Sequence, residues 1–321
     1  MSNEVISTRV RLARNLKDYP FPCRLSEQGR KKVIEKVTSA IRDSNSSIAS
    51  DFNLIKLDDL TEAQGVSLVE RHLVSPEFIS ETEGRALLLS KDESMSIMIN
   101  EEDHIRLQVI TDGLSLEQAY DTADKLDTLF DDKLGYLTQC PTNLGTGMRA
   151  SVMLHLPALE KSRTIGRIAG NLSKLGLTIR GAYGEGSEPS GSLYQLSNQV
   201  TLGISEKAAI ENLENITKQL VSQEQQARER LAKSIDIQDS VSRSLGLLKS
   251  AMVMTHDEAL KLLSNVRFGI LSGQIKDVTA DVVDSLMEKI EPATLMVNSG
   301  KNLSAQERDI ERAKILREAL S

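Results

Sequence analysis

The sequence has very few aromatic residues and no tryptophan. Its 321 residues include five Tyr and five Phe, so aromatic side chains make up only 3% of the chain. Core packing must therefore rest on Leu, Ile, Val, Ala and Met. Hydrophobic residues account for 40% and charged residues for 26%, which is typical of folded globular proteins and argues against wholesale disorder.

Cysteines and long apolar runs are also scarce. Cys23 and Cys140 are the only cysteines, too few for a disulfide framework or a four-cysteine zinc site. No apolar run approaches the ~18 residues of a membrane-spanning helix. The first residues, MSNEVISTRVRLARNL, contain no apolar segment of a secretory signal. We therefore expect a cytoplasmic protein that contacts no membrane.

An excess of basic residues is absent as well. The chain has 39 Lys and Arg against 46 Asp and Glu, which gives a net charge of -7. A protein that coats nucleic acid needs a basic surface that neutralises phosphates, so this balance disfavours direct nucleic-acid binding. It leaves room for a local cluster of arginines.

The common nucleotide-binding motifs are missing too. The sequence has no GxxxxGK[ST] loop, no GxGxxG after a strand, and neither the HRD nor the DFG motif of Ser/Thr/Tyr kinases. If the protein handles phosphate groups, it does so without a P-loop and without that kinase fold.

The sequence does contain a mixed pattern of strands and helices. Short connections between the strand candidates favour an antiparallel sheet over parallel βαβ units. The clearest strands are predicted at residues 86–90, 95–100 and 105–111. Further strands are predicted at residues 177–180 and 193–201.

Two helices are predicted within the same region. Residues 115–118, with the sequence SLEQ, form a capping box, and the apolar stripe that follows predicts a helix as far as Phe130. A second helix is expected from Pro157 to a stop at Gly176. The residues predicted to face inward from it are Ile165, Ile168, Leu172 and Leu175.

The last third of the chain is helical in pattern. Capping boxes at Thr255 and Ser304 mark helix starts, and the polar stretch 219–234 has few apolar anchors. We therefore predict an α+β fold, an antiparallel β-sheet flanked by helices, over residues 1–228. A smaller all-α domain is predicted over residues 229–321.

Two segments of the first domain concentrate charge. In STRVR, residues 7–11, alternate residues of a strand point to the same side, so Arg9 and Arg11 would aim two guanidinium groups at one place. A solvated strand face would show the same pattern. NEEDHIR, residues 100–106, places three acids at a tight junction between strands. A turn charged for solubility is an equal alternative there, and a metal site is disfavoured because a second histidine is missing.

Two further segments have compositions that are unusual for purely structural loops. In CPTNLGTGMRAS, residues 140–151, Cys140 precedes a glycine-containing loop that ends in an arginine. A lone cysteine is usually a small buried hydrophobe, but this loop has unusual backbone freedom and donor capacity. RGAYGEGSEPSG, residues 180–191, carries Glu185 between two glycines, although a plain surface loop would be glycine-rich too.

The combination of these segments favours a phosphate site next to a cation site. Converging guanidinium groups can bind and neutralise a triphosphate as a P-loop would. Carboxylates suit a cationic acceptor instead, and a guanidinium is the natural one because a carboxylate binds it in bidentate fashion.

In this order, the four segments resemble the catalytic domain of the phosphagen (guanidino) kinases, the family of arginine and creatine kinases, over residues 5–225. The resemblance implies that ATP binds here, with Mg²⁺ held through the nucleotide phosphates. It assigns the phosphates to Arg9, Arg11, Arg106, Arg149 and Arg180. Further nucleotide-binding residues implied by the motifs are Ser7, Thr8, Val10, Ala150, Ser151, Val152, Met153, Gly181, Ala182, Tyr183 and Gly184.

The resemblance also implies catalytic residues. Glu102 is similar to the carboxylate that orients the attacking guanidinium nitrogen and takes its proton. Glu185 is similar to the partner carboxylate on the glycine-rich loop, and Cys140 to the thiol beside the guanidinium. His72, in a looser motif, resembles the histidine on the adenine side.

Two departures from the small-molecule kinases point to one subfamily. Those enzymes carry a helical N-terminal domain that encloses the free substrate, whereas STRVR begins here at residue 7. The glycine-rich loop reads Ala182-Tyr183 where they usually have Thr-Arg. An open acceptor site suits an arginine side chain displayed on another protein. The chain therefore most resembles the bacterial protein-arginine kinases.

The C-terminal RDIERA, residues 308–313, matches the phosphoarginine-sensing motif of that subfamily. The match implies an allosteric phosphoarginine site formed by Arg308, Asp309, Arg312 and Ala313. The two arginines are four residues apart on one helix face, where together they can bind a dianionic phosphoryl group. On pattern alone, an ordinary amphipathic surface helix explains the spacing better, and the resemblance reverses that preference.

We therefore predict a protein-arginine kinase that transfers the γ-phosphoryl group of ATP to arginine side chains, giving phosphoarginine and ADP. Two alternatives stay open: a non-catalytic phosphoarginine-binding adaptor and a free-arginine kinase. The resemblance further implies a homodimer and roles in stress response and protein quality control. The partners it implies are an activating zinc-binding protein, a heat-shock repressor and Clp unfoldase–protease machinery.

Overall fold

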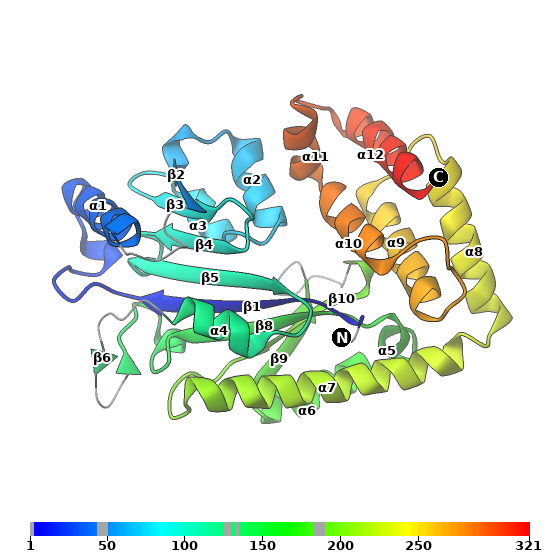
Figure 1. Ribbon diagram of the computed structural model, residues 1–321, viewed down its shortest axis with the longest axis horizontal. Coiled ribbons are helices and arrows are strands. Elements are labelled where there is room, and N and C mark those ends of the chain that lie inside the picture. The colour runs from blue at the N-terminus through cyan, green and yellow to red at the C-terminus, as the bar shows by residue number, and fades with distance from the viewer. Residues whose placement is uncertain (1–2, 44–50, 125–129, 132–134, 183–189) are drawn as a thin grey trace. The chain divides into compact units, whose positions relative to one another are not determined.

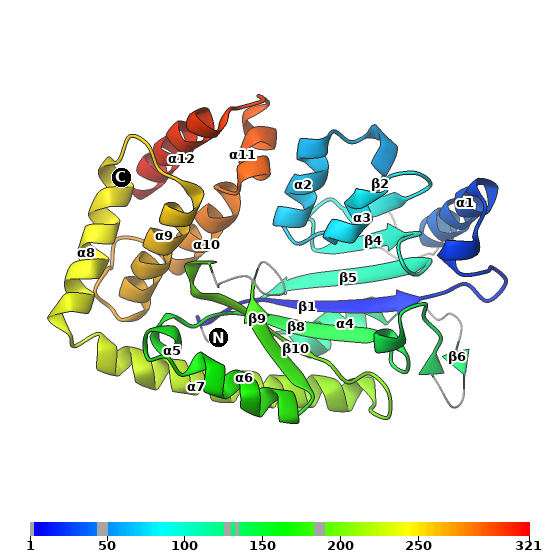
Figure 2. The same cartoon turned by 180° about the vertical axis from the view of Figure 1, so that it is seen from behind.

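The computed structural model describes residues 3–43, 51–124, 130–131, 135–182 and 190–321 (Figure 1, and from behind in Figure 2). They divide into two compact units. The helical unit comprises Met1–Ser7, Val152–Leu196 and Asn215–Ser321, and the sheet unit comprises Thr8–Ser151 and Ser197–Glu214. Within the described ranges, no helix is both long and apolar enough to cross a membrane.

The strands build one large sheet and one small one. The bounds are β1 (Val5–Arg14), β2 (Phe52–Lys56), β3 (Ala86–Ser90), β4 (Met95–Ile99), β5 (Ile105–Asp112), β6 (Phe130–Asp131), β7 (Gly135–Tyr136), β8 (Met148–His155), β9 (Leu177–Gly181) and β10 (Leu193–Asn198). The eight-stranded antiparallel sheet has the order β2-β3-β4-β5-β1-β8-β10-β9, and β6 pairs with β7.

The run from β2 to β5 is the antiparallel meander that the short connections predict. Leu88 of β3 pairs with Ile97 of β4, which in turn pairs with Leu107 of β5. All three side chains are buried. A shift of one residue would move this apolar set to the opposite face, so burial fixes the register that carries the polar residues at the strand ends.

Helices and 3-10 turns complete the sheet unit. They are α1 (Glu27–Asp43), α2 (Glu62–Glu70), α3 (Pro76–Ser80) and α4 (Leu116–Ala123), with 3-10 turns at Pro22–Arg24, Leu57–Asp59 and Pro141–Asn143. One of the cores of this unit forms where Phe78 of α3 packs with Leu87, Leu89 and Met98 of the sheet. Phe78 is fully buried, so it anchors α3 against the strands.

The helical unit consists mainly of helices. Its helices are α5 (Pro157–Lys161), α6 (Ile165–Lys174), α8 (Ile235–Ser250), α9 (His256–Leu271), α10 (Ala280–Lys289), α11 (Pro292–Ser299) and α12 (Ala305–Leu320), with a 3-10 turn at Ser190–Ser192. Helix α7 (Glu206–Leu231) contributes its later residues. In both views, α8, α9, α10 and α12 lie together. The predicted fold class, with its C-terminal all-α region, is confirmed.

Leucines and caps account for the helices of this unit. Leu260, Leu263 and Leu316 are fully buried in its core. Ser304 and Glu307 form the predicted capping box at the start of α12, and this satisfies two backbone donors that would otherwise lack partners. The predicted domain boundary near residue 228 stays a prediction. It falls inside α7, which continues to Leu231.

One predicted helix is wrong in its extent. The apolar stripe predicted a helix from Ser115 to Phe130, but α4 ends at Ala123 and Phe130 belongs to β6. Ser115 does not cap α4 through its side chain. Its hydroxyl donates instead to Asp112 O at 3.0 Å, and this turns the chain at the end of β5.

The helix predicted between Pro157 and Gly176 is two helices, α5 and α6. Arg163 between them has a φ of 55°, a left-handed conformation that ends a helix. The Thr164 hydroxyl donates to Leu159 O at 3.0 Å and closes the turn. Among the residues predicted to face inward, Leu172 is buried, whereas Leu175 is 53% exposed.

Candidate active site

Arginines from three neighbouring strands act on one another electrostatically. β1 carries Arg9 and Arg11 and lies between β5, which carries Arg106, and β8, which carries Arg149. Burial, with the charges of Arg149 and Arg106, lowers the pKa of Arg9 to about 10. Burial also lowers the pKa of Arg11, with Arg9 as the strongest neighbouring charge, while Glu101 opposes the shift. The structure thus brings four of the predicted phosphate-binding residues together.

This cluster has unused hydrogen-bond donors. The buried Nε atoms of Arg9 and Arg11 have no hydrogen-bond partner among the described residues. Like charges that are partly shielded from water repel one another more strongly than exposed ones. Unused donors and surplus positive charge in one place suit a polyanion such as a nucleoside triphosphate.

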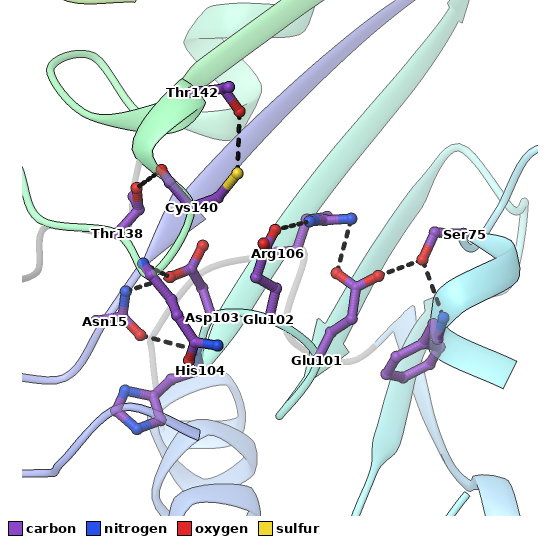
Figure 3. Close-up of polar contacts among 12 residues, drawn as sticks. Asn15, Ser75, Glu101, Glu102, Asp103, His104, Arg106, Thr138, Cys140 and Thr142 are labelled. Atoms are coloured by element: carbon purple, nitrogen blue, oxygen red, sulfur yellow. Dashed lines mark hydrogen bonds and ion pairs between the residues drawn. The ribbon is translucent and has the colours of Figure 1, made fainter. Parts of the chain in front are cut away.

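The turn between β4 and β5 holds two glutamates against Arg106 (Figure 3). Arg106 Nη1 pairs with Glu101 Oε2 at 2.7 Å, and Arg106 Nη2 donates to Glu102 Oε2 at 3.2 Å. The Ser75 hydroxyl also donates to Glu101. The Glu101 side chain is 3% exposed and that of Glu102 is 38% exposed. Glu102 is therefore the carboxylate of the two that a substrate can reach.

Cys140 lies at the start of the Pro141–Asn143 turn, in the loop that leads to β8. Its Sγ lies 2.9 Å from Thr142 Oγ1, and its carbonyl accepts a hydrogen bond of 2.8 Å from the Thr138 hydroxyl. The cysteine is half-buried. These two threonines fix the orientation of the residue while its thiol keeps contact with solvent.

The glycines of this loop are required by close packing rather than by freedom of movement. Gly145 has a φ of 102°, and a Cβ there would lie 2.2 Å from Thr201 O. Gly147 has a φ of 58°, and its carbonyl accepts a hydrogen bond of 2.7 Å from Ala13 N of β1. The loop is therefore tied by its backbone to β1, beside the arginine cluster. The sequence-based interpretation, that the glycines give this loop backbone freedom, is therefore replaced by close backbone packing.

His72 follows α2 with a φ of 59°. Its carbonyl accepts a hydrogen bond of 2.7 Å from Gln108 Nε2 of β5. Burial, with the charges of Arg9 and Arg11, lowers the pKa of His72 to about 4. The imidazole is therefore neutral near pH 7 and lies within the field of the arginine cluster, where the resemblance places the adenine side of the nucleotide.

The other predicted nucleotide-binding residues are spread over the chain. Val10, Ala150 and Val152 are fully buried core residues. The Thr8 hydroxyl donates to Gly113 O at 2.6 Å, and the Ser151 hydroxyl donates to Arg9 O at 3.4 Å. Ser7, Val152, Met153, Arg180, Gly181 and Ala182 belong to the helical unit. Tyr183, Gly184 and the predicted catalytic Glu185 lie outside the described residues.

The predicted phosphoarginine site on α12 is built around a buried arginine. Arg312 is 1% exposed, and its guanidinium donates to Ile290 O at 3.1 Å, Met254 O at 3.0 Å and Asp309 Oδ1 at 2.6 Å. Arg308 donates to Leu303 O at 2.9 Å. Ala313 is buried in the core. Arg312 and Asp309 thus bind each other here, and their role toward phosphoarginine stays a prediction.

Sequence reasoning left out Glu101 and Ser75. Glu101 had a signal, because it stands beside Glu102 in NEEDHIR and either acid of such a pair can take the exposed position. Ser75 had none, since its hydroxyl reaches Glu101 across 26 residues of sequence. Thr142 had a signal as well, because it stands two residues from Cys140 in the same motif.

Comparison with known families decides the assignment. The model of the ATP:guanido phosphotransferase C-terminal catalytic domain matches residues 32–227. The chain belongs to this family. A second model, that of the protein-arginine kinase McsB C-terminal domain, matches residues 234–321 of this guanido phosphotransferase. The resemblance identified from the four motifs is confirmed.

Curated bacterial relatives match this guanido phosphotransferase over nearly its whole length. A protein named protein-arginine kinase from Halothermothrix orenii is 48% identical over 99% of the chain and 93% of its own length. One of the same name from Caldanaerobacter subterraneus is 46% identical over 97% of the chain and 95% of its own length.

Solved guanidino kinases share the fold of this guanido phosphotransferase. Lombricine kinase matches with a TM-score of 0.61 and 26% identity, covering 74% of the chain and 70% of that protein. The duplicated taurocyamine kinase from Schistosoma mansoni, with bound transition state analog components, matches with a TM-score of 0.60 and 30% identity. That match covers 69% of the chain and 33% of the taurocyamine kinase.

Proposed function

We propose that this protein transfers the γ-phosphoryl group of ATP to arginine side chains of proteins, giving phosphoarginine and ADP. The observation that carries the proposal is the arginine cluster, in which burial and neighbouring guanidinium charges lower the pKa values of Arg9 and Arg11, joined through Arg106 to the exposed carboxylate of Glu102. The cluster suits phosphates and the carboxylate suits a guanidinium. Relatives named protein-arginine kinase support a protein arginine as the acceptor.

Arg9, Arg11, Arg106 and Arg149 would bind the phosphates of ATP and stabilise the charge that spreads over the equatorial oxygens during transfer. The donors of this cluster are cationic, so they fit phosphate oxygens and not a metal ion. Mg²⁺ would therefore be held by the nucleotide, where it would neutralise part of the phosphate charge.

Glu102 would align the acceptor. A guanidinium has a pKa above ~12 and enters the site protonated. The carboxylate holds it with one nitrogen facing the γ-phosphorus and receives its proton as the N–P bond forms and the bond from phosphorus to the β-phosphate oxygen breaks. Because a carboxylate is a weak base for this proton, alignment is the larger contribution. Cys140 and Glu185 would flank the same guanidinium.

The proposal extends to regulation and partners. The match of residues 234–321 to the C-terminal domain of a protein-arginine kinase supports phosphoarginine sensing by Arg308, Asp309, Arg312 and Ala313. We include in it a cytoplasmic homodimer that acts in protein quality control under stress. Its partners would be an activating zinc-binding protein, a heat-shock repressor and Clp unfoldase–protease machinery.

The test is ATP-dependent labelling of an arginine-rich protein and of free L-arginine, with wild type and Glu102→Gln side by side. We expect acid-labile phosphate on protein arginine, identified by mass spectrometry, and a loss of at least ~100-fold in the variant. Turnover of free arginine without protein labelling would favour the free-arginine kinase. Phosphoarginine binding without any transfer, also when the activator is added, would favour the adaptor.

A further inference from the structure

A buried carboxylate joins the two segments that carry the predicted catalytic residues of the sheet unit. Asp103 follows Glu102 in the chain and is fully buried. Its Oδ1 accepts a hydrogen bond of 2.8 Å from the backbone N of Gln139, the residue before Cys140. One hydrogen bond therefore links the turn that carries Glu102 to the loop that carries Cys140 (Figure 3).

Asn15 at the end of β1 strengthens this link. Asn15 Nδ2 donates to Asp103 Oδ1 at 2.6 Å and to Leu137 O at 3.1 Å, and His104 N donates to Asn15 Oδ1 at 3.0 Å. The Asn15 side chain is buried, with an exposed fraction of 2% for the residue. Three segments, far apart in the sequence, thus meet at two side chains.

The hydrogen bonds to Asp103 counteract the effect of its burial. Burial raises the pKa of Asp103, and the bonds from Asn15 and Gln139 and the charge of Arg106 oppose the rise. Both donors reach Oδ1, whereas the buried Oδ2 has no hydrogen-bond partner among the described residues. A buried carboxylate is costly unless donors satisfy it, so the two bonds to Oδ1 offset part of that cost. Neither Asp103 nor Asn15 has been given a part in the reaction above.

We propose that Asp103, supported by Asn15, is a positioning residue that sets the spacing between the Glu102 carboxylate and the Cys140 thiol. The inference rests on the proposed function, in which both groups hold one guanidinium. Transfer requires the acceptor nitrogen to be held in line, and a displacement of about 1 Å can cost ~100-fold in rate. Asp103 acts through the backbone of Gln139 and does not touch the substrate.

Variants of Asp103 separate positioning from binding. Asp103→Ala should lower kcat by ~100-fold and leave the KM for ATP within about twofold, because no arginine of the cluster is replaced. Asp103→Asn keeps an acceptor oxygen and should recover to within about tenfold of wild type. The matched control is Asp92→Ala, since Asp92 Oδ1 likewise accepts from a side chain, Ser90, and a backbone N, that of Ser94. It should retain wild-type kcat.

A second pair of variants leaves both buried side chains intact. Gln139→Pro removes the backbone N–H that Asp103 accepts, whereas Gln139→Ala keeps it and shortens an exposed side chain. The proline variant should lose kcat as Asp103→Ala does, and the alanine variant should not. A kcat within threefold of wild type in Asp103→Ala or, if that variant does not fold, in Gln139→Pro would overturn the proposal. Equal losses in Asp103→Ala and Asp103→Asn would overturn it as well.

Failure of the proposed function has a different signature, because wild type itself would then label no protein arginine. The link is tested in that case by hydrogen exchange at the Gln139 amide. Exchange should be slow in wild type and at least tenfold faster in Asp103→Ala. Equal exchange in the two proteins would contradict the positioning role whatever the acceptor proves to be.

Discussion

Arg9 and Arg11 of the sheet unit and Arg267 of the helical unit are all shielded from water, but their surroundings are opposite in charge. In the sheet unit, Arg9 and Arg11 lie among other arginines, and their buried Nε atoms have no partner in the part of the chain that the structure describes. In the helical unit, Arg267 is 1% exposed and binds both carboxylate oxygens of Asp284, at 2.6 and 3.0 Å, and Asn3 O at 2.8 Å.

The difference separates binding from architecture. A paired buried arginine holds segments together, and removing it leaves its hydrogen-bond acceptors buried without a donor. A repelling cluster of arginines weakens the folded state, and this free energy returns when an anion binds. Arg312 belongs with the paired group, since its guanidinium donates to two backbone carbonyls and to Asp309.

The largest effect is expected from removing one of the unpaired arginines of the sheet unit. Arg9→Met should lower kcat/KM for phosphoryl transfer by ~1,000-fold or more, as removal of a cation from a phosphoryl-transfer site does. The exposed Arg42 of α1 provides the control, and Arg42→Met should keep wild-type kinetics. Steady-state kinetics with ATP as the varied substrate measures both, and a loss below tenfold in Arg9→Met would remove Arg9 from the phosphate site.

Removal of the paired Arg267 should act on stability instead. Arg267→Met leaves Asp284 and Asn3 O without their donors, so we expect the free energy of unfolding to fall by about 3 kcal/mol. Arg243, which binds Asp239 on an exposed face of α8, is the matched control and should change it by less than about 1 kcal/mol. Denaturant titration gives both values. Equal effects of the two replacements would mean that burial of the pair is irrelevant.

Arg308 and Arg312 test whether a paired arginine can also bind a ligand. Arg312→Ala should lower the free energy of unfolding by about 2 kcal/mol, because Ile290 O and Met254 O lose their donor. Arg308→Ala should lower it by less than about 1 kcal/mol. Both variants should lose binding of a phosphoarginine peptide at least tenfold by calorimetry. Wild-type affinity in both would remove the sensor from the proposal.

The smallest effect is a dependence of stability on pH. Burial and the charges of Arg267 and Arg228 lower the pKa of His155 below its usual value near 6.5. The unfolded chain therefore binds more protons, and His155 costs stability as pH falls below about 6.5, by at most ~1.4 kcal/mol per pH unit. Glu224 acts in the opposite direction, since burial raises its pKa to about 7.

The contribution of His155 is isolated by difference. Urea titrations of wild type and His155→Gln between pH 7.5 and 5.5 should show that the variant loses less stability on acidification. Parallel pH profiles would mean that the His155 imidazole is protonated in the folded state to the same degree as in the unfolded one.

Local patterns in the sequence sufficed for the meander and for the arginines of β1. Alternation places Ile105 and Leu107 in the core and Arg9 and Arg11 on one side of their strand, because the side-chain period of a strand is two. The four motifs supplied the family. These features depend on neighbours within a few residues or on the resemblance.

Contacts across the fold could not be predicted in this way. The bond between Asp103 and Gln139 joins residues 36 apart, and it depends on where the loop before β8 meets the β4–β5 turn. Helical spacing put Arg308 and Arg312 on one face of α12. It could not show that Arg312 is covered by the residues around Ile290 and Met254.

The most direct measurement is the thermal melting of wild type and Arg11→Met, each with and without a non-hydrolysable ATP analogue and Mg²⁺. Without nucleotide, the variant should melt about 2–4 °C higher than wild type, because a like charge has left the cluster. With nucleotide the order should reverse, since wild type alone gains the full binding free energy. A variant that melts lower without nucleotide, or gains as much from it, would contradict a cluster built to bind triphosphate.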